Sequence, residues 1–172
     1  MIHHKKVENK LKLFYKNKIT KSKSIKLFIF YFIVSTVAMF GSFFKPDAWY
    51  AELSKPLLMP PSWVFPFVWI ILYAMIAAAG WLIGCQKKST TRTYGLTWYA
   101  IQLIANGLWS YFFFGMHRPD LALIDIFILI VALVNCLYFF YFLSKLAFHL
   151  LLPYLAWLLF ALYLNLSIYW LN

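Results

Sequence analysis

Five long apolar runs constrain this chain more than any other feature of its sequence. They cover residues 27–44, 63–85, 94–116, 121–143 and 146–171, with short polar segments between them. Each has at least 18 residues, so as a helix it approaches the ~30 Å thickness of a bilayer's hydrocarbon core. A soluble protein built from five such helices would have little polar surface to offer to water. The runs therefore predict an all-α integral membrane protein, a bundle of five transmembrane helices.

The basic residues divide unequally between the two sides that this topology creates. If the segment before residue 27 is cytoplasmic, thirteen Lys and Arg residues lie on that side and three lie on the other. Basic residues accumulate in the cytoplasmic segments of membrane proteins. We therefore expect the N-terminus inside and the C-terminus outside, with short loops that make consecutive helices antiparallel neighbours.

Residues 1–26 form a strongly basic segment in front of the first apolar run. Nine of the sixteen Lys and Arg residues lie there, in a chain whose net charge is +11. Such a segment beside a membrane span is typical of a cytoplasmic flank attracted to anionic lipid. We expect a disordered tail over residues 1–26 and one membrane domain over residues 27–172, with the bilayer, and not nucleic acid, as the partner of this charge.

The longest connection, residues 45–62, contains four prolines and several apolar side chains. Because proline fixes backbone angles, we expect a segment of defined shape and not a flexible tether. Two interpretations are open. The segment could be an aromatic anchor at the level of the lipid headgroups, or it could be a lid over a pocket between the helices.

Polar residues within the apolar runs are the main candidates for function, because unpaired polar groups are costly in hydrocarbon. Gln102, Asn106 and Ser110 recur at four-residue intervals and so share one helix face. Asp125 lies little more than one turn into the fourth run, where the free amides of a helix N-terminus can stabilise a carboxylate. The fifth run adds Tyr154 and Asn165.

Each of these amides could simply bond a neighbouring helix, which is their commonest role in membranes. Trp69 and Trp109, however, lie deeper in their runs than interfacial tryptophans usually do. Aromatic rings and amides together could hold a flat apolar ligand by stacking and burial. Gly80 and Gly84 are separated by three residues, a spacing that permits close helix packing, and Gln102 is a further candidate for helix packing.

Residue patterns of catalytic or metal sites are missing from the sequence. Cys85 and Cys136 have neither disulfide nor metal spacing, and His117 and His149 are assigned to opposite sides of the membrane. The sequence contains no Gly-rich phosphate loop, and no catalytic triad is suggested. We predict no catalytic residues, no metal site and no required cofactor.

Several motifs follow one another in a set order over residues 25–172. They are KPDAWY at 45–50, LSKP at 53–56, PPSWVFPFVW at 60–69, QLIANGLWSYFFFG at 102–115, ALID at 122–125, PYLAW at 153–157 and LN at 164–165. In this combination they resemble the TspO/MBR family, the tryptophan-rich sensory proteins whose mitochondrial members are called the translocator protein or peripheral benzodiazepine receptor.

The resemblance implies a five-helix bundle, usually a homodimer, with a pocket beneath the first loop. It also implies binding of porphyrins such as protoporphyrin IX and haem, and of sterols or drugs in some members. By motif, the ligand-binding residues would be Tyr50, Trp69, Tyr73, Asn106, Trp109, Ser110, Asp125, Trp157 and Ala161.

Two departures from the family pattern limit what is carried over. Leu57 and Leu58 stand in a part of the loop where many bacterial members have Trp, and no basic residue follows Tyr163 or Tyr169, as a sterol-recognition pattern would require. We therefore do not expect sterol binding.

The leading interpretation is a membrane receptor or carrier for tetrapyrroles in a bacterial inner membrane, with a sensory, regulatory or transport role. Two alternatives are open. One is tryptophan-dependent photo-oxidative breakdown of porphyrin, and the other is a membrane scaffold that regulates a partner complex.

Overall fold

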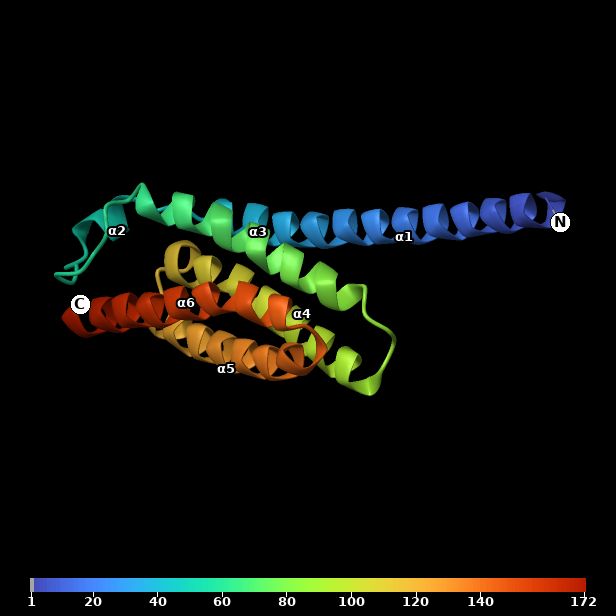
Figure 1. Ribbon diagram of the computed structural model, residues 1–172. Helices are drawn as coiled ribbons and strands as arrows, with labels where there is room; N and C mark the ends of the chain where they lie inside the picture. Colours follow the sequence, from blue (N-terminus) through green and yellow to red (C-terminus); the bar gives the residue numbers. More distant parts are fainter. Residues whose placement is uncertain (1) are drawn as a thin grey trace.

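In the computed structural model the chain forms an elongated bundle of long helices (Figure 1). The structure describes the backbone of residues 2–172 and the side chains of residues 20–172. The long helices are α1 (Ile2–Ser42), α3 (Val64–Gly84), α4 (Thr90–Ser110), α5 (Pro119–Leu143) and α6 (Lys145–Leu171). A short helix, α2 (Ala48–Glu52), lies in the first connection, and a π-helical turn, η1 (Tyr111–Gly115), follows α4. The described part of the chain is all-helical, as predicted.

Local chemistry explains where the helices begin. Ser89 and Ser144 cap α4 and α6, because their hydroxyls accept the backbone N–H of Arg92 at 3.2 Å and of Ala147 at 3.3 Å. Pro119 occupies the first position of α5, where its missing N–H is not needed. The long helices after α1 therefore begin within about four residues of the predicted apolar runs.

Four helical segments are long and apolar enough to cross a membrane: Thr20–Ser42 of α1, and the whole of α3, α5 and α6. The helix that corresponds to the remaining predicted run, α4, is not among them. Its sequence begins with Thr-Thr-Arg-Thr and includes Gln102 and Asn106, so its mean hydropathy is lower. Gln102 and Asn106 are buried inside the bundle, whereas Thr90 and Thr93 are exposed at the start of α4.

The five long helices form a closed ring in which α1 contacts α3, α3 contacts α6, α6 contacts α5, α5 contacts α4, and α4 returns to α1. Large apolar side chains such as Phe28, Phe67, Ile70 and Phe127 are exposed on the outside of this ring. Such a surface suits lipid and would be unfavourable in water.

Two groups of apolar side chains fill the inside. The larger, the core cluster, runs through the ring and includes Ile76, Tyr99, Leu133, Phe140 and Tyr154. The smaller, the lid cluster, lies where the 45–62 segment folds over the end of the bundle. Its members are Phe113, Ala122 and Ile168, with Trp49, Tyr50, Leu53, Met59, Trp109, Phe112 and Phe114 packed against them.

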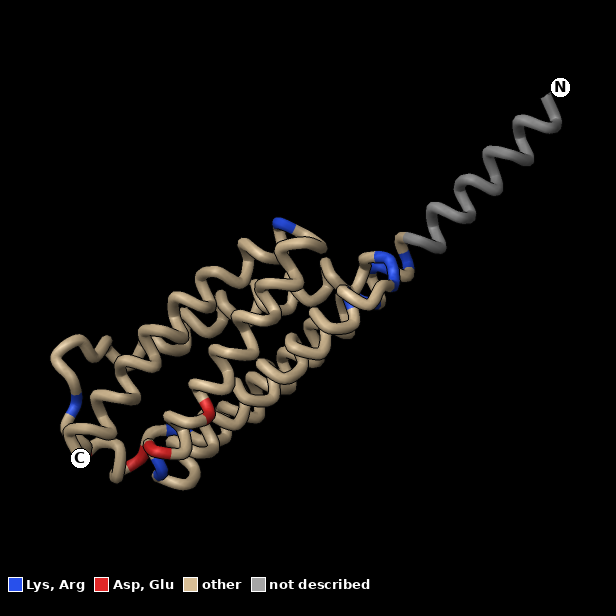
Figure 2. The backbone as a smooth tube through the Cα atoms, turned by 90° about the horizontal axis from the view of Figure 1, so that it is seen from below, with Lys and Arg blue, Asp and Glu red and all other residues tan. Residues whose placement is uncertain are grey.

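Charged residues gather at the two ends of the bundle, as Figure 2 shows. The acidic residues Asp47, Glu52 and Asp120 lie at the end covered by the 45–62 segment, together with Lys45, Lys55 and Arg118. At the opposite end, where α1 approaches the C-terminus of α3, the charged residues that the structure describes are basic.

The beginning of α1 differs from the prediction. We expected a disordered tail through residue 26, but residues 20–26 continue the first membrane helix without a break. The reason lies in contacts with α3: Lys26 Nζ donates to the Gly84 carbonyl at 3.0 Å, and Trp81 Nε1 donates to the Lys23 carbonyl at 3.0 Å. The expected disorder of the preceding side chains lies outside the described residues.

Candidate functional site

A chain of hydrogen bonds links α3, α4 and α6 at the centre of the bundle. Tyr73 Oη donates to Asn106 Oδ1 at 2.8 Å, and Asn106 Nδ2 donates to Tyr154 Oη at 2.8 Å. Tyr154 Oη in turn donates to Gln102 Oε1 at 3.1 Å. Gln102 and Asn106 lie one turn apart on α4, so the predicted shared face brings both amides to the same tyrosine.

Trp69 of α3 covers this polar chain on one side. Its ring stacks on Tyr73 with centroids 5.0 Å apart and meets the ring of Tyr154 edge-on at 6.1 Å. The geometry is typical of favourable aromatic pairs. Trp69, Tyr73 and Asn106 are thus brought together as predicted, but Tyr154 fills the space between them.

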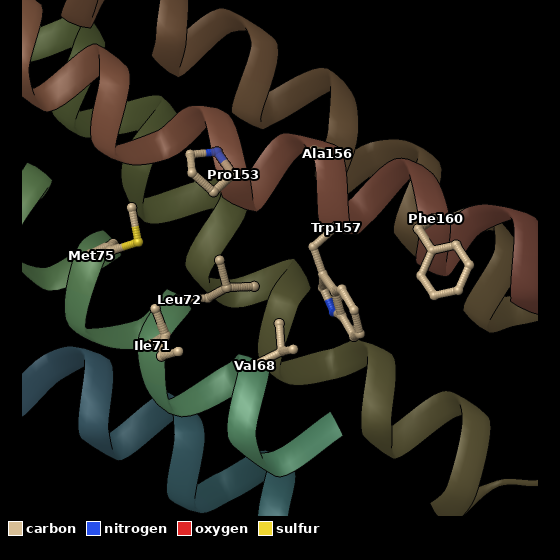
Figure 3. Close-up of a pocket in the computed structure, with 8 residues that line it drawn as sticks. All are labelled: Val68, Ile71, Leu72, Met75, Pro153, Ala156, Trp157 and Phe160. Carbon is tan, nitrogen blue, oxygen red and sulfur yellow. The ribbon is translucent and has the colours of Figure 1, made fainter. Parts of the chain in front are cut away.

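An apolar groove of about 430 Å³ lies beside this network, between α3 and α6 (Figure 3). It is open along one side and lies within two of the candidate membrane spans. The lining comprises Val68, Ile71, Leu72 and Met75 from α3, and Pro153, Ala156, Trp157 and Phe160 from α6. Small side chains at Pro153 and Ala156 leave the space, and Trp157 forms its wall.

Trp157 alone among the nine predicted ligand-binding residues lines this groove. Its ring meets Phe65 and Phe160 at 5.9 Å and 5.6 Å. Ala161, one turn further along α6, is half-buried. The expectation of a single hollow shared by Trp69, Asn106 and Trp157 is therefore not met by this groove, because the first two belong to the packed interior.

Tyr50 and Trp109 both pack in the lid cluster, where they contact the same two phenylalanines. Trp109 stacks on Phe113 at 5.0 Å, and Tyr50 meets Phe114 edge-on at 5.3 Å. The π-helical turn η1 widens the backbone after Trp109, and Phe113 and Phe114 from this turn contact α2 residues. The sequence did not indicate that these phenylalanines would contact the 45–62 segment, because an apolar Tyr-Phe-Phe-Phe run does not predict a π-helical turn.

Asn165, which its polarity alone marks in the sequence, provides hydrogen-bond partners for two groups beside the lid cluster. Trp109 Nε1 donates to Asn165 Oδ1 at 3.0 Å, and Asn165 Nδ2 donates to the Pro119 carbonyl at 2.9 Å. Asp125 is buried, and its Oδ2 has no hydrogen-bond partner among the described residues. Ser110 packs against Gly41 of α1, so it leaves the face expected to carry Gln102 and Asn106.

Two contacts hold the 45–62 segment over the lid cluster. His117 Nε2 lies 2.9 Å from Asp47 Oδ2, and the His117 ring stacks on Trp49 at 4.4 Å. The side chain of Asn172 accepts the Ser54 N–H at 2.9 Å and donates to the Ser54 carbonyl at 3.2 Å. The segment therefore covers one end of the bundle as the lid interpretation requires.

Asp47 also begins α2, because its Oδ1 accepts the Tyr50 N–H at 3.2 Å. This backbone hydrogen bond, together with the nearby His117, lowers the pKa of Asp47 below its ordinary value of 3.8. The Asp47 carboxylate is consequently charged at all pH values above its ordinary pKa of 3.8. Burial raises the pKa of the Tyr50 phenol above its ordinary value of 10.0, so the phenol is neutral at neutral pH.

Gly80 and Gly84 permit α1 to lie close to α3. A Cβ atom at Gly80 would come within 2.6 Å of Tyr99 and 2.7 Å of Phe30, and one at Gly84 within 2.5 Å of Phe30. The small-residue pair therefore serves packing inside one chain. Among the described residues, no group of three His, Cys, Asp or Glu side chains could hold a metal ion.

Comparisons with known proteins agree with the motifs. The TspO/MBR family model matches residues 28–171. A tryptophan-rich protein TspO of Chlorobaculum tepidum is 43% identical over 140 residues, which cover 79% of this chain and 89% of that protein. A tryptophan-rich protein TspO of Archaeoglobus fulgidus is 38% identical over 86% of this chain and 97% of that protein. The human translocator protein is 37% identical over 68% of this chain and 70% of that protein. With its family model, its relatives and its membrane-length helices all in agreement, this chain is a multi-pass membrane protein that belongs to the TspO/MBR family.

Proposed function

We propose that this protein is a membrane receptor or carrier that binds tetrapyrroles, such as protoporphyrin IX or haem, and similar flat apolar ligands. The observation that carries the proposal is an apolar groove with an indole wall, from Trp157, next to the aromatic and amide network of Trp69, Tyr73 and Asn106. A planar ring system gains from stacking on indole and from burial against aliphatic side chains.

The site would be reached from within the membrane. The groove is open on its side and lined by apolar side chains, so an apolar ligand could enter it without crossing water. Tyr154 is hydrogen-bonded to both Asn106 and Gln102, and its rotation would free these amides for the polar groups of a ligand. Asp125 and the apolar lid cluster would form a second region of the site, beneath the 45–62 segment.

The same proposal includes the finer points of topology. We infer that α4 is the fifth span, because it lies in the ring between α1 and α5 and its polar residues face inward. The excess of basic residues at one end supports an N-terminus inside and a C-terminus outside. A homodimer in a bacterial inner membrane, with a sensory or transport role, completes the proposal.

The test is a titration of protoporphyrin IX into the detergent-purified protein, followed by quenching of tryptophan fluorescence. We expect saturable binding that is about five- to tenfold weaker in Trp157→Ala, because one aromatic contact contributes about 1 kcal/mol beyond its buried area. Trp170→Ala is the matched control, since Trp170 also belongs to α6 but is 80% exposed near its end. Equal affinity in both variants would contradict the proposed groove.

A further inference from the structure

The two ends of the bundle differ in how their charges are balanced. At the lid end, Lys45, Lys55 and Arg118 accompany three carboxylates, and Arg118 is paired with Asp120 through two hydrogen bonds at 2.8 Å and 2.6 Å. At the opposite end, besides Lys145 at the start of α6, the described residues include six cations from two separate segments. These are Lys21, Lys23 and Lys26 of α1, and Lys87, Lys88 and Arg92 around the α3–α4 connection. We call them the basic patch.

Tertiary contacts at the C-terminus of α3 assemble the basic patch. Lys26 Nζ and Arg92 Nη2 both donate to the Gly84 carbonyl at 3.0 Å, and Arg92 Nε donates to the Ile83 carbonyl at 3.0 Å. Cations favour this position because the last carbonyls of a helix carry partial negative charge. These bonds hold the α1 lysines beside the α3–α4 connection, although the two segments are some sixty positions apart in the sequence.

Among the residues whose side chains are described, the remaining four cations of the patch have no counter-charge. Lys21, Lys23, Lys87 and Lys88 are exposed, and within the described residues none of their side chains forms a hydrogen bond or ion pair. The carboxylates that the structure describes belong to the 45–62 segment and to α5. They lie toward the other end of the bundle (Figure 2). Clustered like charges repel one another, so an external anion would stabilise this arrangement.

We propose that the basic patch binds the headgroups of anionic phospholipids, so that this end of the protein sits in an anionic membrane surface. The depth supports this assignment, because the patch lies at the ends of the candidate spans Thr20–Ser42 and Val64–Gly84. Lysine side chains at such positions extend to the headgroup level, where each adds attraction to anionic lipid. The proposal is independent of the ligand groove, which lies between α3 and α6.

Half of this surface comes from outside the part of the chain that the family model matches. The match begins at residue 28, whereas Lys21, Lys23 and Lys26 precede it. The α3–α4 connection lies inside the match. One half of the patch therefore precedes the residues that the family model matches, and the other half lies among them.

The experiment uses the full chain reconstituted in phosphatidylcholine vesicles that contain spin-labelled phosphatidylglycerol or spin-labelled phosphatidylcholine. Electron paramagnetic resonance measures the fraction of each probe held at the protein surface. We expect a several-fold preference for phosphatidylglycerol that weakens with added sodium chloride. The double variants Lys87→Gln, Lys88→Gln and Lys21→Gln, Lys23→Gln should each reduce the preference at least twofold, because each removes unpaired cations.

The double variant Lys45→Gln, Lys55→Gln is the control, since it removes the same charge from the lid end. It should leave the preference unchanged. The proposal is overturned if the wild type shows no preference, if the control loses as much as the patch variants, or if inorganic phosphate abolishes the preference at an ionic strength where chloride does not. The last outcome would assign the patch to a free phosphate compound. Circular dichroism confirms that each variant keeps its helix content.

Discussion

Asn106 joins three helices through one carboxamide group. Its oxygen accepts from Tyr73 of α3, and its nitrogen donates to Tyr154 of α6, both at 2.8 Å. Tyr154 is fully buried, and Tyr73 is partly buried against the core cluster. The residue therefore contributes to stability as well as to the polarity of the proposed site.

Replacing Asn106 by alanine should destabilise the protein by about 1–2 kcal/mol. The change leaves the Tyr73 hydroxyl without its acceptor and removes one of the two partners of the Tyr154 hydroxyl. Such losses in membrane bundles are modest but measurable. Thermal unfolding in detergent measures the effect, with a thiol-reactive dye that reports exposure of Cys136, which is fully buried in the folded protein.

Asn135→Ala is the matched control for this experiment. The Asn135 side chain bonds only the Val131 carbonyl of its own helix, at 2.8 Å, so its removal leaves no partner on another helix unpaired. If both variants unfold at the temperature of the wild type, the Asn106 bonds do not hold the helices together.

At the level of helices, α1 approaches α3 most closely at two glycines of α3. Phe30 of α1 lies over Gly80 and Gly84, and Tyr99 of α4 presses on Gly80 from another side. Tyr99 cannot withdraw easily, because its hydroxyl donates to the Ile76 carbonyl at 3.0 Å. The glycine pair is thus surrounded by fixed neighbours.

Gly80→Ala should destabilise the bundle by about 1–3 kcal/mol, as expected when a methyl group enters a filled space. The same thermal assay detects this loss. Gly107→Ala is the comparison, because the nearest side-chain atoms to its new Cβ would be at 3.4 Å and 3.5 Å, an ordinary contact distance. We expect Gly107→Ala to be neutral or stabilising, since alanine favours helix; equal losses in the two variants would argue against the close packing of α1.

The 45–62 segment is held at two points, which permits a test of each. Asp47→Asn keeps an oxygen that can cap α2 but weakens the contact with His117, and Asn172→Ala removes both bonds to Ser54. We expect each change to speed amide hydrogen exchange in residues 48–58, by about fivefold for Asn172→Ala if its bonds contribute about 1 kcal/mol.

The control for the lid is Asp120→Asn, which breaks the neighbouring pair with Arg118 but touches no residue of the 45–62 segment. Exchange in this segment should not respond to it. Unchanged exchange after both Asp47→Asn and Asn172→Ala would mean that the apolar lid cluster alone holds the segment.

For the whole molecule, the direction of each helix decides which loops share a side of the membrane. If all five long helices cross, Ser89 and Ser144 lie on the same side as the basic patch, whereas Ser54 and Met116 lie on the other. Single cysteines at these positions, in a background with Cys85 and Cys136 replaced by serine, should react with an impermeant maleimide from opposite sides. Equal accessibility of positions 89 and 116 from one side would show that α4 does not cross.

The sequence by itself determined that this protein is a membrane protein, where its long helices lie in the chain, and to which family it belongs. Each of these depends on local properties: the length of an apolar run, a capping serine or proline, or an ordered set of motifs. The four-residue spacing of Gln102 and Asn106 likewise predicted that both amides share a face, because helix geometry alone sets that relation.

Only the tertiary structure decided what those side chains meet. Tyr154 fills the space that was expected to be hollow, Ser110 turns to α1, and the groove forms between α3 and α6 where Pro153 and Ala156 are small. These outcomes depend on how each helix is rotated and placed against its neighbours, which the periodicity of one helix does not specify. The extension of α1 before residue 27 has the same origin, since its ordering contacts come from Gly84 and Trp81 of another helix.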